Sequence, residues 1–346
     1  MKEMKFGKGR WELVMSVIKV ALLGFGTVGE GVYSAIQSHQ AQLRKLLGKE
    51  VRIVAILIRD QTKERMIDAN ILVTTNFEDI IEIPDLDVIF EAIVGEEPGR
   101  SYLLQAIEKG IHVVTANKEM FANHGHELIQ RAQENEVNIG FEATTAGGVP
   151  IIRTIKQLLQ VNQITKIQGI LNGTSNFILT EMRERKLSFA DALQLAQNKG
   201  YAEADPTNDI SGIDAFYKLM ILSQLVINQQ PNWSEVIIDG IKSITQEQIE
   251  QAEKRGQRFK HIAEISFNDH SLVASVQPII VDSNHPLYSI EGVENAIAVE
   301  ASLVGKITLQ GPGAGKFATA SAMIEDFVDI IQHSATKKRR EYQSIK

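Results

Sequence analysis

Short apolar runs alternate with longer amphipathic segments through the first half of the chain. Residues 17–23 form a continuous β-branched and aliphatic run, which is typical of a strand buried on both faces. The apolar positions of residues 27–47 then recur at helical spacing. Further strands are predicted at 51–58, 87–93, 111–115 and 137–141, and further helices at 100–109 and 121–136. Alternation at this pitch predicts an α/β fold of the Rossmann type, a doubly wound parallel sheet with helices on both faces.

The regular alternation of predicted strands and helices ends near residue 150. Helices are predicted at 151–159, 176–185, 189–198 and 210–227, and strands at 164–171, 260–267, 272–281, 296–299 and 306–309, before a last helix to about residue 331. We therefore expect a first domain over 15–146, a second α/β domain over 147–305, and a C-terminal segment over 306–332 that returns to the first domain. Residues 1–14 and 333–346 carry no pattern of their own, and we expect flexible ends there.

The composition excludes several classes of protein. The 346 residues include 36 basic and 43 acidic side chains, a formal net charge of −7, which argues against a nucleic-acid partner. There is no cysteine, so disulfides, thiolate metal sites and cysteine nucleophiles are excluded. No apolar run reaches the roughly 18 residues of a membrane span, and the N-terminus lacks the apolar stretch of a secretory signal. We expect a cytoplasmic protein with no membrane partner.

The first predicted strand runs directly into Gly-Phe-Gly-Thr-Val-Gly at residues 24–29. In such a turn the first glycine permits the bend, the second lets the backbone approach a pyrophosphate, and the third lets the helix pack close to the strand. Free N–H groups at the start of the helix then face the anion. Because the motif joins a strand to a helix, these are the candidate residues for binding NAD or NADP: Gly24, Phe25, Gly26, Thr27, Val28 and Gly29.

Two other strand ends carry candidate cofactor or substrate groups. Arg59-Asp60 follows the second strand, where a ribose-binding acid is expected. A cation there can meet a 2′-phosphate, which favours NADP, whereas an exposed Arg59 beside a ribose-binding Asp60 would suit NAD. Lys118 lies just past the carboxyl end of a later strand, where open α/β sheets bind ligands. From position alone, a site lysine and a solvated surface lysine are equally good interpretations.

Ionisable residues are densest over residues 201–218, which include Glu203, Asp209, Asp214 and Lys218. Asp214 and Lys218 are four residues apart and share a helix face. One interpretation is a helix N-terminus stabilised by acidic residues, with a single intrahelical ion pair. The other is a site that binds an ammonium group and moves a proton. The number of ionisable residues exceeds what helix capping needs and favours the second interpretation.

Two turns carry weaker signals. Asn172 and Thr174 lie where a predicted strand ends and a helix begins, which is typical of a capped turn. Glu142 opens a glycine-rich segment that joins the two regions. That segment offers one carboxylate and several backbone carbonyls to a hard cation.

Six motifs, in this order, resemble those of homoserine dehydrogenase. They are GFGTVG at 24–29, TANK at 115–118, EATTAGGVPII at 142–152, NGTSNFIL at 172–179, YAEADPTNDISGIDAFYKL at 201–219, and GPGAG with TASA over 311–322. The resemblance implies NAD(P)-dependent interconversion of L-homoserine, a small-molecule substrate, and L-aspartate 4-semialdehyde, on the route to threonine and methionine. It also implies a homodimer whose central region carries the substrate site and the subunit interface.

The resemblance further implies roles for individual residues. Lys218 is implied as the acid/base lysine, and Lys118 as a second lysine at the substrate and the nicotinamide. Glu203 would hold the substrate ammonium. The rest of the implied polar substrate site is Asp209, Asp214, Asn172 and Thr174.

Cofactor and cation contacts are implied in the same way. Beyond the glycine turn, the implied cofactor contacts are Arg59, Thr115, Lys118 and Gly315. A monovalent cation, sodium or potassium, would be held by Glu142 and by the carbonyls of Thr145, Gly147 and Val149.

The sequence departs from the family's pattern at Val94, where a glycine is usual in the loop expected to pass the nicotinamide. Many relatives carry a C-terminal regulatory domain; about 15 residues follow the last predicted helix here, so we expect a short form without threonine feedback through such a domain. Two alternatives remain open. One is another two-domain NAD(P)-dependent dehydrogenase of a small amino or hydroxy acid, and the other is a non-catalytic nucleotide sensor, which would need neither Lys118 nor Lys218.

Overall fold

The computed structural model describes residues 3–7, 10–14, 17–268 and 271–344. The chain divides into two compact units, which are described separately below. The first unit comprises residues 1–120, 124–143 and 319–346, and the second comprises residues 121–123 and 144–318. This division differs from the expected segment 306–332, because strand β14 (Gly305–Pro312) pairs along its whole length with β13 (Glu294–Ala301) and therefore belongs to the second unit.

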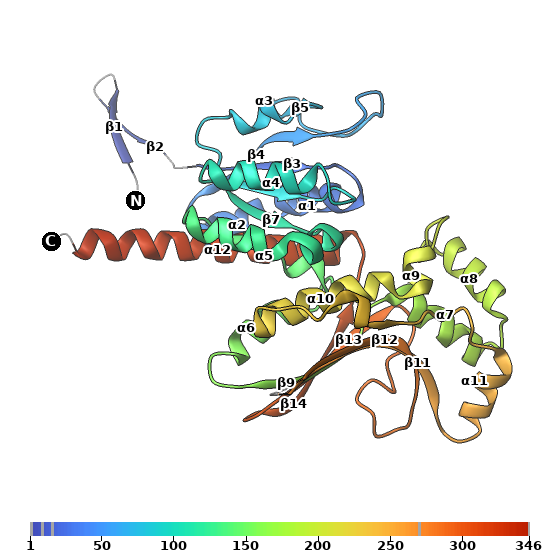
Figure 1. The fold of residues 1–346 in the computed structure, drawn as a ribbon. Helices are drawn as coiled ribbons and strands as arrows, with labels where there is room; N and C mark the ends of the chain where they lie inside the picture. Colours follow the sequence, from blue (N-terminus) through green and yellow to red (C-terminus); the bar gives the residue numbers. More distant parts are fainter. Residues whose placement is uncertain (1–2, 8–9, 15–16, 269–270, 345–346) are drawn as a thin grey trace. The chain divides into compact units, whose positions relative to one another are not determined.

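The first unit is built on a six-stranded sheet in the order β5-β4-β3-β6-β7-β8, in which all neighbouring strands run parallel (Figure 1). This confirms the Rossmann-type expectation. The strands are β3 (Val17–Leu23), β4 (Glu50–Leu57), β5 (Leu72–Thr74), β6 (Val88–Glu91), β7 (His112–Thr115) and β8 (Ile139–Gly140). The helices are α1 (Thr27–Ser38), α2 (Gln40–Leu47), α3 (Glu78–Ile81), α4 (Gly99–Glu108), α5 (Lys118–Glu134) and the greater part of α12 (Lys316–Ser344).

The apolar strands explain the core of this unit. Val20 and Leu22 of β3 are almost completely buried, and they share one hydrophobic cluster with Val32 of α1 and with residues of α12. The ring of Phe327 on α12 lies 5.5 Å from that of Phe90 on β6. Helices therefore cover strands that would otherwise expose a continuous apolar run, which is how parallel sheets are stabilised.

The described residues near the two chain ends form regular secondary structure. Strands β1 (Glu3–Gly7) and β2 (Arg10–Val14) pair in antiparallel register, and α12 continues without a break to Ser344. Among the described residues, no helix is both long enough and apolar enough to span a membrane.

The second unit is built on a six-stranded mixed sheet in the order β10-β12-β11-β9-β13-β14. Only the β10–β12 pair runs parallel among these strands. The additional strands are β9 (Ile164–Ile170), β10 (Ile237–Ile238), β11 (Arg258–Asn268) and β12 (Ser271–Val281). The helices are α6 (Ile151–Leu158), α7 (Gly173–Glu184), α8 (Phe189–Asn198), α9 (Thr207–Ser211), α10 (Ile213–Ile227) and α11 (Gln246–Glu253). Helices α6, α7 and α10 lie along one side of the sheet in Figure 1.

The single helix predicted over 210–227 is two helices that meet at Gly212. This residue has φ of +93°, a left-handed conformation that glycine adopts without steric cost. A Cβ there would also lie 3.2 Å from the His261 ring. The break lets α9 leave the axis of α10, which separates Asp209 from the helix that carries Asp214 and Lys218.

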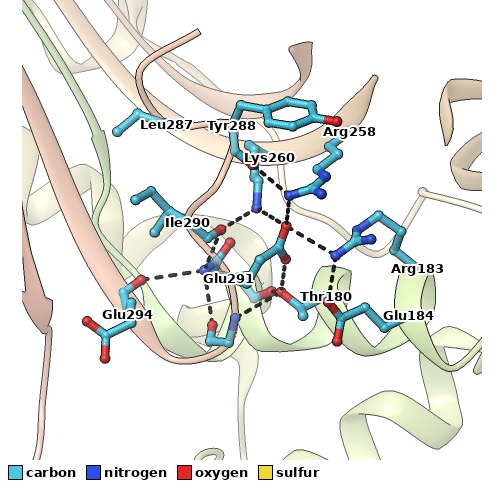
Figure 2. A network of polar contacts seen from close by, with 12 residues as sticks. Thr180, Arg183, Glu184, Arg258, Lys260, Leu287, Tyr288, Ile290, Glu291 and Glu294 are labelled. Carbon is cyan, nitrogen blue, oxygen red and sulfur yellow. Dashed lines mark hydrogen bonds and ion pairs between the residues drawn. The ribbon is translucent and has the colours of Figure 1, made fainter. Parts of the chain in front are cut away.

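A buried polar network joins α7 to β11 and to the loop before β13 (Figure 2). The carboxylate of Glu291 forms ion pairs with three cations. The N–O distances are 2.7 Å to Arg258, 3.1 Å to Lys260 and 3.2 Å to Arg183. Lys260, whose side chain is 2% exposed, also donates to the Ile290 carbonyl. One carboxylate therefore contacts three cations inside the second unit, of which Arg183 also pairs with Glu184 at 2.8 Å.

Candidate active site

The glycine turn between β3 and α1 has the geometry of a dinucleotide cradle. Gly24 has φ of +95°, and a Cβ on it would lie 2.7 Å from the Ala92 carbonyl oxygen. A Cβ on Gly29 would lie 2.1 Å from the Gly24 carbonyl oxygen, so only glycine lets α1 pack this closely. A Cβ on Gly26, by contrast, would have no atom of the described residues within 4 Å.

The open side of this turn is where a pyrophosphate would bind. Gly26 is the N-cap of α1, and no described side chain caps this helix end. N–H groups at a helix N-terminus attract anions. The residues present therefore fit a dinucleotide, with Phe25, Thr27 and Val28 completing the turn.

The loop after β4 bears on the choice of cofactor. The Asp60 side chain is hydrogen-bonded within its own loop. Its Oδ1 accepts hydrogen bonds from the Thr62 hydroxyl at 2.7 Å and from the Thr62 N–H at 2.9 Å. Hydrogen bonds from the Thr62 side chain and backbone lower the pKa of Asp60. Arg59 beside it is exposed. This geometry favours the arginine over the aspartate as the group available to a ribose substituent.

The loops after β6 and β7 lie at the same carboxyl edge of the sheet. Lys118 is the first residue of α5, and its helix is capped by Asn117, whose side chain accepts the Met120 N–H at 3.1 Å. Thr115 ends β7 and is buried. Val94, in the loop after β6, is 93% exposed, so this departure from the family's glycine adds an uncovered apolar side chain at the edge where open α/β sheets bind ligands.

A second cluster of predicted residues comes together in the second unit. The Lys218 ammonium donates to Asp214 Oδ2 at 2.8 Å and to the Leu171 carbonyl at 2.6 Å. Asn172 donates to both Asp214 Oδ2, at 2.9 Å, and Asp209 Oδ1, at 2.8 Å. The structure thus joins Lys218, Asp214, Asn172 and Asp209, which sequence analysis placed in one site.

The N-terminus of α7 positions this cluster. Asn172 is its N-cap and accepts the Ser175 N–H at 2.8 Å, which fixes the amide. The Ser175 hydroxyl donates to the Asp209 carbonyl at 2.7 Å. Thr174 donates to the Tyr201 carbonyl at 2.6 Å, so it holds the loop before α9 through its backbone. The turn that looked like simple capping therefore also orients the ionisable residues.

The ion pair at the centre of this cluster is buried. The side chains of Lys218 and Asp214 are 9% and 3% exposed, so their ion pair is shielded from solvent. Asp209 adds a second carboxylate, hydrogen-bonded to the same asparagine.

Glu203 is not brought into this cluster. It lies exposed in the loop before α9, where its backbone carbonyl accepts a hydrogen bond from Gln197 at 3.1 Å. Sequence analysis missed Asn295, a buried residue of β13 whose amide donates to the Leu171 carbonyl at 3.1 Å, beside Lys218. Asn295 lies just before the strand predicted at 296–299, so the apolar run gave no signal for it.

The predicted cation ligands lie in buried backbone. Glu142 is 3% exposed, Thr145 is 0% and Val149 is 1% exposed. Gly147 has φ of +55°, and a Cβ on it would lie 2.5 Å from the Gly313 carbonyl oxygen. Among the described residues no group of three or more His, Cys, Asp or Glu side chains is arranged for a metal ion.

Gly315 immediately precedes α12 and has φ of +111°. Within the described part of the chain, a Cβ on this residue would meet no atom closer than 4 Å, so its backbone is open to a ligand.

Two family models match the chain. Residues 24–142 match "Homoserine dehydrogenase, NAD binding domain", and residues 150–328 match "Homoserine dehydrogenase". The chain belongs to the homoserine dehydrogenase family. The homoserine dehydrogenase of Bacillus subtilis (strain 168) is 41% identical over 320 residues, 92% of this chain and 74% of that protein.

Other members of the homoserine dehydrogenase family differ in cofactor. The NAD(+)-dependent homoserine dehydrogenase of Pseudomonas canavaninivorans is 37% identical, covering 94% of this chain and 99% of that protein. The crystal structure of a homoserine dehydrogenase from Thiobacillus denitrificans has a TM-score of 0.88 at 39% identity, covering 93% of this chain and 75% of that chain. A hyperthermophilic archaeal homoserine dehydrogenase solved in complex with NADPH has a TM-score of 0.78 at 28% identity, covering 92% and 98%.

Proposed function

We propose that this chain interconverts L-homoserine and L-aspartate 4-semialdehyde with NAD(P), as an oxidoreductase of the threonine and methionine routes. The observation that carries the proposal is the buried Lys218–Asp214 pair beside Asn172 and Asp209. This arrangement supports a site in which Lys218 transfers a proton and a neighbouring carboxylate holds the ammonium of an amino acid. Family membership and the open glycine turn supply the cofactor side of the reaction.

The residues of the cluster divide the work between proton transfer and substrate binding. In the direction of aldehyde reduction, the Lys218 ammonium donates a proton to the oxygen of the forming alkoxide; in the direction of alcohol oxidation, the neutral amine accepts the hydroxyl proton. Asp214 orients Lys218, and the Leu171 carbonyl fixes the same nitrogen from the other side. Asp209, which Asn172 holds at the edge of the buried pair, would shape the polar site around the substrate.

Glu203 and Lys118 complete the proposed site. Glu203 would bind the substrate ammonium if its loop, which is exposed here, folds over the substrate. Lys118 would serve as a second lysine at the substrate and nicotinamide. A bound nicotinamide supplies the hydride acceptor or donor at its ring carbon. The chain's own part is to hold that cofactor through residues 24–29, Arg59, Thr115 and Gly315.

Arg59 supports NADP over NAD as the preferred cofactor, since Asp60 is bonded to its own loop. The proposed monovalent cation would be held by Glu142 and by the carbonyls of Thr145, Gly147 and Val149, which are oxygen donors of the kind that a hard cation prefers. The cytoplasm is the proposed location.

A homodimer formed through the second unit is proposed from membership of the homoserine dehydrogenase family. The sheet strands and turns of this unit leave large apolar side chains exposed, namely Ile237, Val273, Ile280 and Leu303. Contact with another chain would remove such side chains from water. Light scattering of the purified protein should give twice the mass of one chain, and a monomer would contradict the proposal.

The function is tested by a steady-state assay of the purified chain. L-homoserine is expected to give saturable reduction of NADP, while L-serine, L-threonine and a simple 2-hydroxy acid at the same concentration are expected to give none. Preference for one of those other substrates would move the assignment to another dehydrogenase. Binding of NADPH without turnover of any of them would support a nucleotide sensor.

A further inference from the structure

One buried carboxylate of the first unit has no part in the roles assigned so far. Glu91 is the last residue of β6 and is 0% exposed. Its Oε1 accepts the Ile93 N–H at 2.6 Å, and its Oε2 accepts the hydroxyl of Thr115 at the end of β7. The Asn117 side chain donates to it as well. Donors from two different loops therefore converge on one carboxylate, which is how a buried charge is tolerated.

Glu91 stands between the two loops that carry cofactor-site residues. The parallel register aligns Leu23, Glu91 and Thr115, which end β3, β6 and β7. The N–H of Ala92, the next residue, donates to the Leu23 carbonyl at 2.8 Å, immediately before the glycine turn. On the remaining side, Gly99 at the start of α4 is so close that a Cβ on it would lie 3.3 Å from Oε1.

A chain of hydrogen bonds leads from Glu91 to Lys118. Thr115 Oγ1, which donates to Glu91, accepts the Asn117 N–H at 3.0 Å. The Asn117 amide donates to the Gly95 carbonyl at 2.7 Å, and its oxygen caps α5. Because Lys118 is the first residue of α5, the start of its helix is fixed by the same set of bonds.

We propose that Glu91 is a positioning residue, whose ionised carboxylate ties the loop after β6 to residues 115–118 and so fixes Lys118 relative to the glycine turn. This inference rests on the proposed function, because it assigns Lys118 to the reacting site. The hydrogen-bonding groups that meet the Glu91 carboxylate, from Ile93, Thr115 and Asn117, are all donors. A carboxylate can accept hydrogen bonds from all of them. A protonated carboxyl or an amide carries a donor of its own, so it can accept fewer of these hydrogen bonds.

The two protonation states are both accessible near neutral pH. Burial raises the pKa of Glu91 to about 7, and it is opposed by the hydrogen bonds from Thr115, the Ile93 N–H and Asn117. Among the described residues, no charged side chain is a cause of this shift. Protonation below neutral pH should therefore loosen the link, and ionisation above it should restore the link.

The test compares wild type with Glu91→Gln, which keeps the shape and removes the charge. We expect kcat of wild type to exceed that of Glu91→Gln by about tenfold or more at about pH 8.5, because small displacements of catalytic groups are costly. The ratio should fall to within about twofold at about pH 5.5, where Glu91 is itself protonated. The ratio is the readout because every other titrating group is common to both proteins. Circular dichroism at both pH values checks the fold.

The matched control is Glu82→Gln, whose side chain is 69% exposed and pairs with Lys109. Its kcat ratio should stay near one at both pH values. A Glu91→Gln loss that is equal at the two pH values, or no loss at all, would overturn the positioning role. NADPH fluorescence provides a readout that does not need turnover: the Kd of Glu91→Gln should exceed that of wild type about threefold or more at about pH 8.5 and match it at about pH 5.5. If wild type turns over no homoserine, the proposed function fails, while this binding comparison still decides for or against Glu91.

Discussion

The network around Glu291 gives a stability prediction whose size follows from burial. We consider Glu291→Gln, which keeps the shape of the side chain and removes the one carboxylate facing three cations. Those cations are Arg258 at 2.7 Å, Lys260 at 3.1 Å and Arg183 at 3.2 Å (Figure 2). Lys260 is the critical partner, because its side chain is only 2% exposed.

The expected cost can be bounded from both sides. Removing one partner of a buried ion pair typically costs about 3–5 kcal/mol, because the other charge is left uncompensated. Lys260 can limit the cost at neutral pH by losing its proton, which requires at most about 4.6 kcal/mol for a lysine of ordinary pKa at pH 7. Its remaining bond to the Ile290 carbonyl and the partial exposure of Glu291 place the expected loss in the free energy of unfolding near the lower end, about 3 kcal/mol.

The pH dependence has a definite sign. Burial lowers the pKa of Lys260, and Glu291 opposes that effect, so removing Glu291 lowers the pKa further. A lysine whose pKa is lower in the folded state binds fewer protons there than in the unfolded chain, so stability rises with pH up to the ordinary lysine pKa. The penalty of Glu291→Gln should therefore shrink as the pH rises above neutrality.

The free energy of unfolding is measured at each pH by urea denaturation. The fluorescence of Trp233, in a Trp11→Phe background, monitors the transition. Trp233 reports the second unit, since its ring packs 4.9 Å from that of Phe216 on α10. Glu184→Gln is the matched control: its carboxylate also pairs with Arg183 but is 51% exposed, so we expect a loss below about 1 kcal/mol.

Two results would refute the reasoning. One is a Glu291→Gln loss below about 1 kcal/mol, and the other is a loss that does not shrink at about pH 9.5. The double variant Glu291→Gln/Lys260→Met should be more stable than the sum of the two single effects predicts, because it removes the buried charge together with its partner.

Three further predictions concern the cofactor and the cation. Gly26→Val should abolish NADPH binding without unfolding the protein, since a Cβ at residue 26 meets no neighbour among the described residues. Gly29→Ala should destabilise the first unit, because its Cβ would lie 2.1 Å from the Gly24 carbonyl oxygen. NADPH titration and thermal melts of both variants test this, and a Gly29→Ala variant as stable as wild type would contradict the packing argument. Arg59→Ala should raise the KM for NADP about tenfold and leave that for NAD within about twofold, and an equal change in both would remove Arg59 from 2′-phosphate recognition. Replacing sodium and potassium by a large organic cation should lower kcat in wild type but not further in Glu142→Gln; an unchanged wild-type rate would argue against the cation.

Strands and turns were predictable where the signal is local. The run at β3 and the glycine spacing after it are contiguous in sequence, so both were located from the pattern alone. Strand β5 has three residues and is largely exposed, so it leaves no periodicity to detect. Helix α11 is strongly polar, and its signal was the capping box formed by Thr245 and Gln248, which the hydrophobic pattern does not report.

The site shows the same division between local and long-range information. Asp214 and Lys218 lie one helical turn apart, and their pairing follows from spacing. The Leu171 carbonyl and Asn295 amide reach the same place from residues 124 positions apart, through the pairing of β9 with β13. Strand register of that kind is set by the whole sheet, so no local motif predicted it.

Turnover of L-homoserine by wild type and by Lys218→Met tests the central claim most directly, with NADP as cofactor and NADPH binding measured on the same samples. The account predicts saturable turnover by wild type, a kcat lower by about 10²-fold or more in the variant, and an NADPH Kd within about twofold of wild type. Methionine keeps much of the buried stem of the lysine, so the fold should persist, which circular dichroism checks. Near-normal turnover in a folded Lys218→Met, or no homoserine turnover in a wild type that binds NADPH, would contradict the account.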